Sequence, residues 1–211
     1  MRLEAVNLGR RETIRLGARA VDTGIDKRPA ERAFVGRLGL AGDVVADVEN
    51  HGGADQAVYL YARDDYAWWE SELGTPLAAG TFGENLTVPT LGAAPRPGDR
   101  VRVGSTLLEL TAPRVPCAVF AHKMGEPDWV KRFAAAERPG AYARVVKEGE
   151  VAPGDPVELV PTATDHPTLV ELLRLWYDKR AAADVVERAL AAPVAERLRA
   201  SLERRLAQAT T

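Results

Sequence analysis

The stretch GDRVRVGSTLLELTAP, residues 98 to 113, alternates apolar and polar residues with a period of two. Val101 and Val103 lie on one side of a Gly-Ser pair, and Leu108 and Leu110 on the other, so one face is apolar. This pattern predicts β-structure. The Gly-Asp pair that opens the stretch recurs at 42–43 and 154–155. These pairs indicate tight turns of an antiparallel, barrel-like sheet, because Gly and Asp tolerate the dihedral angles that such turns need.

Similar patterns on both sides extend this prediction to most of the chain. Strands are expected near residues 3–8, 32–43, 56–62, 84–88, 142–146 and just before 160, with short helices at 62–74 and 129–137. After residue 161 a segment rich in Pro and Thr leads into three amphipathic helices. The sequence therefore predicts a mainly β-protein with helices. A barrel-like domain is expected at 1–160, followed by a small three-helix bundle at 161–211.

Composition narrows the function classes. The chain has 211 residues, of which 46% are hydrophobic and 27% charged, and its formal net charge is −2. This charge gives no general reason to bind a nucleic acid polymer or an anionic membrane. The sequence has no run of about 18 apolar residues, so no membrane span is predicted. The charged N-terminal stretch does not resemble a secretory signal. We therefore expect a cytoplasmic protein whose thiol stays reduced.

The single cysteine, Cys117, lies in RVPCAVFAHK, residues 114 to 123. Prolines on both sides of Arg114 stiffen this segment, and Arg114 can bind a phosphate or carboxylate with two hydrogen bonds. A nearby cation also favours the thiolate, which binds metals and attacks electrophiles. Two readings stay open, since a lone cysteine is commonly an inert buried residue. A nucleophilic dyad of Cys117 with His51 or His122 is also open.

Two further stretches hold candidate binding residues. In NHGGADQAVYLY, His51 precedes Gly52 and Gly53, whose backbone can approach a ligand closely. In FGENLTV, Asn85 offers an amide donor and a carbonyl acceptor to a planar heterocycle, and Glu84 can accept hydrogen bonds from ring nitrogens. The three histidines have no ligand-like spacing, so no metal site made of protein ligands alone is predicted.

The order GLAGD, NHGGADQAVYLY, FGENLTV, RVPC and GAYARVVKEGEVAPGD resembles the MOSC domain family, named for the C-terminal domain of molybdenum cofactor sulfurases. The resemblance covers nearly the whole chain. It is to the free-standing bacterial YiiM-like type with a C-terminal three-helix extension. It implies a MOSC β-barrel at 1–160 and the extension at 161–211.

The resemblance also implies a cofactor, the molybdenum cofactor, in which molybdopterin carries Mo on a dithiolene. Cys117 matches the family's metal ligand, and a soft thiolate suits such a centre. The segment TGIDKRP, residues 23–29, resembles the part that contributes a lysine to the phosphate end of the cofactor. This makes Lys27 a candidate, and Arg28 a second one. Arg114 would serve the phosphate or the dithiolene side, and Arg144 would bind the cofactor or support the barrel.

The remaining candidates complete the implied site. His51, Gly52 and Gly53 would form the pocket wall near Mo, with His51 assisting proton delivery. Asn85 and Glu84 would contact polar edges of the pterin or the substrate.

By resemblance, the expected activity is the reduction of N-hydroxylated compounds, such as hydroxylaminopurine-type base analogues, to amines. Electrons would come from a separate reductase, for which the C-terminal helices are a plausible dock, and the apolar helix faces allow a homodimer. The alternatives are a sulfur carrier with a persulfide on Cys117, and a module that binds or stores the cofactor. Ala118 stands where the family often has a bulkier residue. This difference concerns the shape of the substrate side of the site more than cofactor binding.

Overall fold

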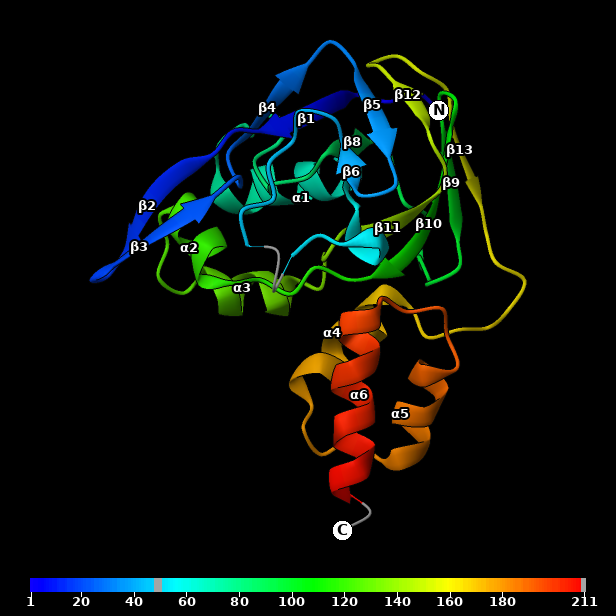
Figure 1. Cartoon of the computed structure of the whole chain (residues 1–211). Coiled ribbons are helices and arrows are strands. Elements are labelled where there is room, and N and C mark those ends of the chain that lie inside the picture. The colour runs from blue at the N-terminus through cyan, green and yellow to red at the C-terminus, as the bar shows by residue number, and fades with distance from the viewer. Residues whose placement is uncertain (48–50, 210–211) are drawn as a thin grey trace.

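The computed structural model describes residues 1–47 and 51–209, and its main element is an eight-stranded mixed sheet (Figure 1). The strand order is β13–β9–β10–β11–β7–β8–β1–β4, with every neighbouring pair antiparallel except β7 and β8. The bounds of these strands are β1 Ala5–Gly9, β4 Lys27–Ala30, β7 Val58–Ala62, β8 Leu86–Val88, β9 Arg100–Val103, β10 Thr106–Ala112, β11 Ala141–Lys147 and β13 Val157–Val160.

The stretch with period two forms the hairpin of β9 and β10. Val103 pairs with Thr106 and Val101 with Leu108 across a turn at residues 104–105. The four apolar residues that define the pattern are buried: Val101, Val103, Leu108 and Leu110. Each repeated Gly-Asp pair occurs at a turn, and its glycine has a positive φ, as expected.

The mainly β class with helices is confirmed, and within the described residues the sheet stays open rather than closing into a barrel. β4 and β13 are its two ends, and they do not pair with each other. The sheet curls far enough for the N-terminal residues to reach β13, where Arg2 and Pro156 form an isolated bridge. The Leu3 N–H also donates to the Asp155 carbonyl at 2.8 Å. Closure therefore rests on single contacts instead of a continuous ladder.

Two smaller sheets complete the β-structure. One has the order β12–β5–β6 and the other pairs β2 with β3. Their bounds are β2 Glu12–Leu16, β3 Arg19–Thr23, β5 Ala33–Gly36, β6 Gly39–Leu40 and β12 Gly149–Val151. The single strand expected at 32–43 is thus two short strands, because the chain turns at residues 37–38.

Three helices pack on the sheet through aromatic side chains. They are α1 Arg63–Leu73, α2 Ala118–Met124 and α3 Trp129–Ala136. Trp69 of α1, Phe120 of α2 and Phe133 of α3 are fully buried, and the Phe120 and Phe133 rings meet edge to face with centroids 5.0 Å apart. Aromatic rings contribute large buried areas, so this cluster fixes α2, the helix that follows Cys117.

The last three helices form a group below the sheet in Figure 1, after a long connection from β13. They are α4 Leu169–Tyr177, α5 Ala183–Leu190 and α6 Glu196–Ala209. Thr168 and Glu171 form a reciprocal capping box at the start of α4. No helix in the described part of the chain is long and apolar enough to cross a membrane. The boundary at residue 161 between two domains stays a prediction.

Specific polar contacts attach these helices to the sheet. Asp55, in the short 3-10 helix η1 (Ala54–Gln56), accepts a hydrogen bond from Arg144 of β11 at 3.0 Å. Its other oxygen accepts from the backbone N–H of Glu196, the first residue of α6, at 3.0 Å. Arg144 also donates to the Pro193 carbonyl just before α6. The carboxylate of Asp55 therefore holds sheet and helix at one point.

We expect Asp55→Ala to lower the free energy of unfolding by about 1–3 kcal/mol, since it removes charged hydrogen bonds on two elements. Amide hydrogen exchange should become faster in α6 while the β9–β10 pairing keeps its protection. Urea unfolding and exchange mass spectrometry measure these changes. The matched control is Glu158→Ala, which breaks an exposed ion pair with Arg102 and should cost less than about 1 kcal/mol. Equal effects of the two substitutions would contradict the role of Asp55.

Candidate functional site

A pocket of about 720 Å³, partly open to solvent, lies where separate segments of the chain meet. Its walls come from residues 21–27, 43–47 and 51–59 and from the segment between β10 and α2. Six of the site residues predicted from the sequence line it: Lys27, His51, Gly52, Asn85, Arg114 and Cys117. The fold therefore brings together most of the candidates.

Arg114 places a buried positive charge in this pocket. Its side chain is 4% exposed, and its Nε has no hydrogen-bond partner among the described residues. The guanidinium lies 4.4 Å from the ring centroid of Phe120 and 5.0 Å from that of Tyr59, instead of on a carboxylate. Gly83 leaves room beside it, since a Cβ at Gly83 would stand 3.4 Å from Nη1. Burying a charge without a counter-ion is costly, so this arrangement favours an anionic ligand.

Lys27, by contrast, has a partner inside the protein. Its Nζ lies 2.6 Å from both carboxylate oxygens of Asp43, and both side chains are nearly buried. Asp43 also accepts from the Asn85 side chain at 2.8 Å and from the Gly9 N–H at 2.7 Å. Burial lowers the pKa of Lys27, and the Asp43 charge opposes that shift. Lys27 thus lines the pocket as half of a neutralised pair.

Asn85 is similarly engaged. Its side-chain oxygen accepts from the Tyr59 N–H at 3.1 Å, and its side-chain nitrogen donates to Asp43. Its backbone N–H and carbonyl bond to Tyr59 and Asn7 in the neighbouring strands. The amide therefore holds β1, β7 and β8 in position at the pocket wall.

Cys117 is half-buried and is the N-cap residue of α2. It follows residues 113–116, which are neither helix nor strand and which leave the end of β10. The helix after it is pinned by the buried Phe120. The thiol is thus accessible from the pocket and sits on a fixed backbone, which is what a metal ligand or nucleophile needs.

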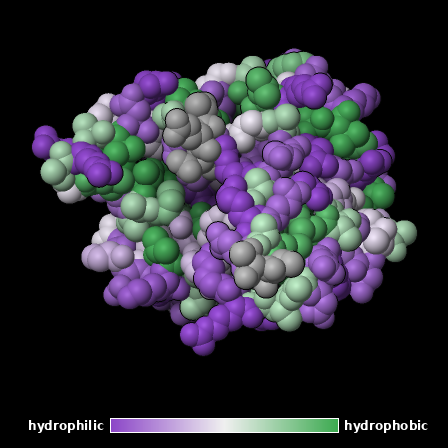
Figure 2. All heavy atoms as spheres, turned by 60° about the horizontal axis from the view of Figure 1, so that its bottom comes forward, coloured by the Kyte–Doolittle hydropathy of each residue, from purple (hydrophilic) through white to green (hydrophobic). Residues whose placement is uncertain are grey.

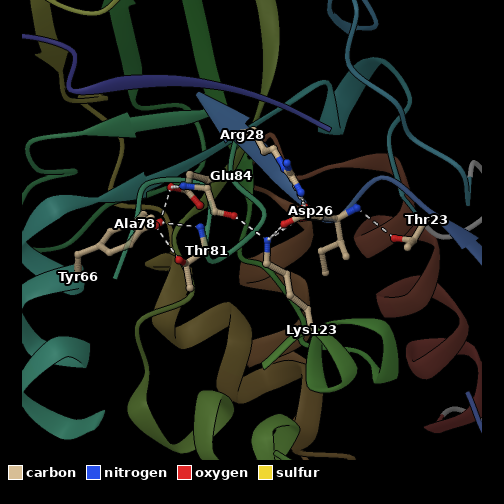
Figure 3. Close-up of polar contacts among 10 residues, drawn as sticks. Thr23, Asp26, Arg28, Tyr66, Ala78, Thr81, Glu84 and Lys123 are labelled. Carbon is tan, nitrogen blue, oxygen red and sulfur yellow. Dashed lines mark hydrogen bonds and ion pairs between the residues drawn. The ribbon is translucent and has the colours of Figure 1, made fainter. Parts of the chain in front are cut away.

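Lys123, at the other end of α2, connects this helix to two loops (Figure 3). Its Nζ donates to the Ile25 carbonyl at 3.1 Å and to the Gly80 carbonyl at 3.0 Å, and it lies 3.3 Å from an Asp26 oxygen. These contacts hold α2 against the segment that precedes Lys27. Helix α2 is therefore fixed relative to Lys27, the residue expected at the phosphate end of the cofactor.

His51 lines the pocket with a mostly buried imidazole. Burial, followed by the positive charge of Arg114, lowers its pKa to about 4. His51 is therefore neutral near pH 7, where it can accept a proton or a hydrogen bond. Gly52 after it has φ +74°, and a Cβ there would approach Val45 to 3.0 Å. A glycine is needed at this position for both reasons.

Glu84 is fully buried behind the pocket rather than in its lining. One of its oxygens accepts from the Tyr66 hydroxyl at 2.6 Å (Figure 3) and from the Gly80 N–H at 2.7 Å. The same oxygen accepts from the Thr87 hydroxyl at 2.7 Å. The carboxylate thereby shapes the loop at residues 80–84 that carries Gly83.

Three other candidates lie outside the lining of this pocket. Arg28 is exposed and pairs with Asp26 at 3.1 Å. Gly53 is the residue before η1. Arg144 pairs with Asp55 and Glu109 and bonds to the segment before α6, as described above. Arg144 thus contacts residues that support the fold, and its two expected roles stay predictions.

Residues that sequence reasoning did not single out complete the wall. Asp43 was considered only as part of a turn, although the GLAGD stretch belongs to the pattern that resembles the family. Tyr59, Tyr142 and Gln56 line the pocket, but as strand or loop residues they carry no distinguishing signal. Lys123 likewise belongs to a helix that the strand-and-turn pattern did not predict.

Comparison with known proteins identifies the family. A model of the MOSC domain matches residues 47–158, which is more than half of the chain. The chain belongs to the MOSC domain family. It is 36% identical to the uncharacterized protein YflK of Bacillus subtilis, over 93% of this chain and 90% of YflK.

Two other relatives extend the comparison. The crystal structure of YiiM from Geobacillus stearothermophilus superposes with a TM-score of 0.77 and 28% identity, covering 97% of this chain and 99% of that one. This confirms the YiiM-like fold, C-terminal helices included. A protein named Reductase from Gibberella moniliformis is 32% identical over 60% of this chain, but the match spans 23% of that longer protein.

Arg114 and Cys117 lie within residues 47–158, which match the MOSC domain, whereas Lys27 and Asp43 precede that region. The pocket therefore needs a chain segment N-terminal to the matched part. Asp43, which binds Lys27 within that segment and accepts from Asn85 of the matched part, connects the two.

We expect Asp43→Asn to lower the free energy of unfolding by about 3–5 kcal/mol, because it leaves the Lys27 cation buried without a counter-ion. The double variant Lys27→Met with Asp43→Leu should lose less, since it removes both charges. The control is Arg28→Met, whose exposed pair with Asp26 should be worth less than about 1 kcal/mol. Urea unfolding of the cofactor-free protein measures all three. If the double variant were the least stable, the buried pair would not have the role assigned to it.

The lowered pKa of His51 predicts a pH-dependent stability. Between pH 6.5 and about 4 the unfolded chain binds a proton at His51 that the folded protein does not, so stability falls as pH falls through this window. From pH 7 to pH 5 the loss due to His51 should be about 2 kcal/mol. Unfolding of the cofactor-free wild type and of His51→Gln at both pH values isolates it. The same loss in the variant would show that other groups cause it.

Proposed function

We propose that this MOSC protein is an oxidoreductase that holds the molybdenum cofactor, with the Cys117 sulfur as the protein ligand to Mo, and reduces N-hydroxylated compounds to amines. The observation that carries this proposal is the buried guanidinium of Arg114, whose Nε has no hydrogen-bond partner among the described residues, in the same pocket as Cys117. An anionic cofactor that also accepts one soft ligand matches this pair of groups.

The residues present fit such a group. The cofactor brings its dithiolene sulfurs and a phosphate, so the protein needs to add one thiolate and a positive cradle. Arg114 provides the positive charge, since Lys27 is already neutralised by Asp43. The MOSC family is associated with binding of the molybdenum cofactor, and the relative named Reductase supports redox chemistry.

When bound, the cofactor would supply a two-electron centre able to remove oxygen from nitrogen. The balanced reaction is R–NHOH plus two electrons and two protons, giving R–NH2 and water. The N–O bond breaks and the substrate nitrogen is reduced. The electrons come from a separate reductase. Hydroxylaminopurine-type base analogues are the proposed substrates.

His51 is proposed to donate a proton in this reaction. In the free protein the charge of Arg114 contributes to lowering the pKa of His51. An anion that pairs with Arg114 removes part of that effect, so the pKa of His51 rises toward 7. Binding of the anionic group would thus prepare the imidazole to donate a proton.

Metal analysis of protein from a host that makes molybdopterin tests the proposal. We expect stoichiometric Mo in the wild type and none in Cys117→Ser, with the far-ultraviolet circular dichroism unchanged. Reduction of 6-hydroxylaminopurine by dithionite-reduced methyl viologen should require that Mo. Absent Mo with cyanide-labile sulfur on Cys117 would instead establish a sulfur carrier, and Mo without reduction a cofactor-storage module.

Arg114→Met separates ligand binding from folding in the same experiment. It should lower Mo content while leaving the free energy of unfolding of the cofactor-free protein the same within about 1 kcal/mol, or higher, because a buried unpaired charge is lost. A large loss of stability with normal Mo content would mean that Arg114 serves the fold. The control Arg28→Met should leave both quantities unchanged.

A further inference from the structure

A second cavity, of about 1070 Å³ and partly open to solvent, also reaches Cys117. The residues that it shares with the pocket described above are Asp47, His51, Gln56, Cys117, Val119 and Tyr142. Its remaining wall differs in origin, because it includes side chains of the C-terminal helices. The sulfur of the proposed metal ligand is therefore bordered by two cavities.

The C-terminal helices provide one part of the apolar wall, and residues 112–119 provide another. Leu172 and Trp176 come from α4 and Leu198 from α6. A polar pair in the cavity wall joins α6 to η1, where Arg197 donates to the Gln56 side-chain oxygen at 2.9 Å. The cavity thus combines apolar surfaces, an aromatic ring and a hydrogen-bonding edge beside the thiol.

The wall is held in a fixed position. Asp55 binds the first turn of α6 to the sheet, and the Ala195 N–H donates to the Thr111 carbonyl of β10 at 3.1 Å. At the start of α4, the Leu169 N–H donates to the Pro95 carbonyl at 2.8 Å. These contacts place the helices as a permanent part of the cavity.

We propose that the C-terminal helices form the substrate chamber, with Trp176 as a specificity-determining residue that stacks on the planar ring of the substrate. This deepens the proposed function and rests on it. Apolar walls with a hydrogen-bonding edge suit a flat heteroaromatic ring better than an alkyl chain, which needs no polar edge, or an anion, which needs a cation free of other partners. The reacting N–O group would then lie next to Cys117 and His51.

Ala118 is the second observation that points to this use. It is exposed and lines only the second of these two cavities, directly beside Cys117. A bulky residue here would fill the space in which the ring has to lie. The methyl group of Ala118 therefore leaves the chamber wide enough for a bicyclic heterocycle.

The outer surface gives less support for the alternative use of these helices as a docking site. Figure 2 turns this end of the molecule toward the viewer and shows mainly hydrophilic residues, with hydrophobic ones in small separate groups. The apolar residues of α4 and α6 are instead buried, among them Leu169, Leu172, Leu198 and Leu202. Their apolar faces are thus used inside the protein.

The test compares Trp176→Ala with Trp176→Phe and with the neighbouring control Tyr177→Ala, whose side chain is 44% exposed and outside the cavity. Isothermal titration calorimetry measures binding of 6-hydroxylaminopurine to the protein as isolated, and steady-state kinetics measures its reduction. We expect Trp176→Ala to raise Kd and KM by about tenfold, the loss typical of one aromatic–base stack, with kcat and Mo content unchanged. Trp176→Phe should keep most of the affinity, and Tyr177→Ala all of it.

Ala118→Phe is a second variant that removes nothing from the core. It should abolish binding of 6-hydroxylaminopurine while reduction of unsubstituted hydroxylamine, which needs no ring site, continues. Normal Kd and KM in both Trp176→Ala and Ala118→Phe would overturn the chamber, even if Mo and reduction are present. Absence of Mo or of reduction in the wild type would instead reject the proposed function. If the wild type lacks Mo or reduction but still binds 6-hydroxylaminopurine, and Trp176→Ala weakens that binding, the chamber is supported without the proposed function.

Discussion

The carboxylate of Asp43 is the constraint on which the site depends. It accepts hydrogen bonds from Lys27 at the start of β4, from Gly9 at the end of β1 and from Asn85 just before β8. Three neighbouring strands of the sheet are thereby fixed to one loop residue. The carboxylate also neutralises the lysine, so the positive charge that faces the pocket is that of Arg114.

Among the described residues that line the pocket, Lys27 and Arg114 are the cations, and they differ in their contacts: Lys27 contacts a carboxylate and Arg114 contacts aromatic rings. A cation with a buried partner stabilises the fold and adds little net charge for a ligand, whereas a cation that contacts ring faces keeps its charge available. The aromatic cluster under α2 serves this purpose as well as packing. Phe120 anchors the helix that starts at Cys117 and also provides a face for the guanidinium.

Much of the fold could be predicted from the sequence because its signals are local. The hairpin of residues 100–112 follows from period-two alternation, and the helix after Thr168 from spacing and capping. The helix at 118–124 was missed, since Pro116 and Cys117 look like a loop and only packing of Phe120 against distant rings makes the segment helical. The turns indicated a barrel-like sheet, but no local signal shows that its ends meet through single contacts such as that of Arg2 with Pro156. In the site, residue types indicated Arg114 and Cys117, but no local pattern shows that Asp43 occupies Lys27, or that Arg144 faces the C-terminal helices.

Lys123 has a consequence for how this site is inherited. Its amine joins α2 to the carbonyls of Ile25 and Gly80, so the segment RVPC gets its orientation from two loops distant in the chain. The segment RVPC alone is therefore not enough to form this site. Moved into another sheet without these carbonyls and without the rings that pack on Phe120, it would lose the alignment of sulfur and guanidinium that defines the pocket.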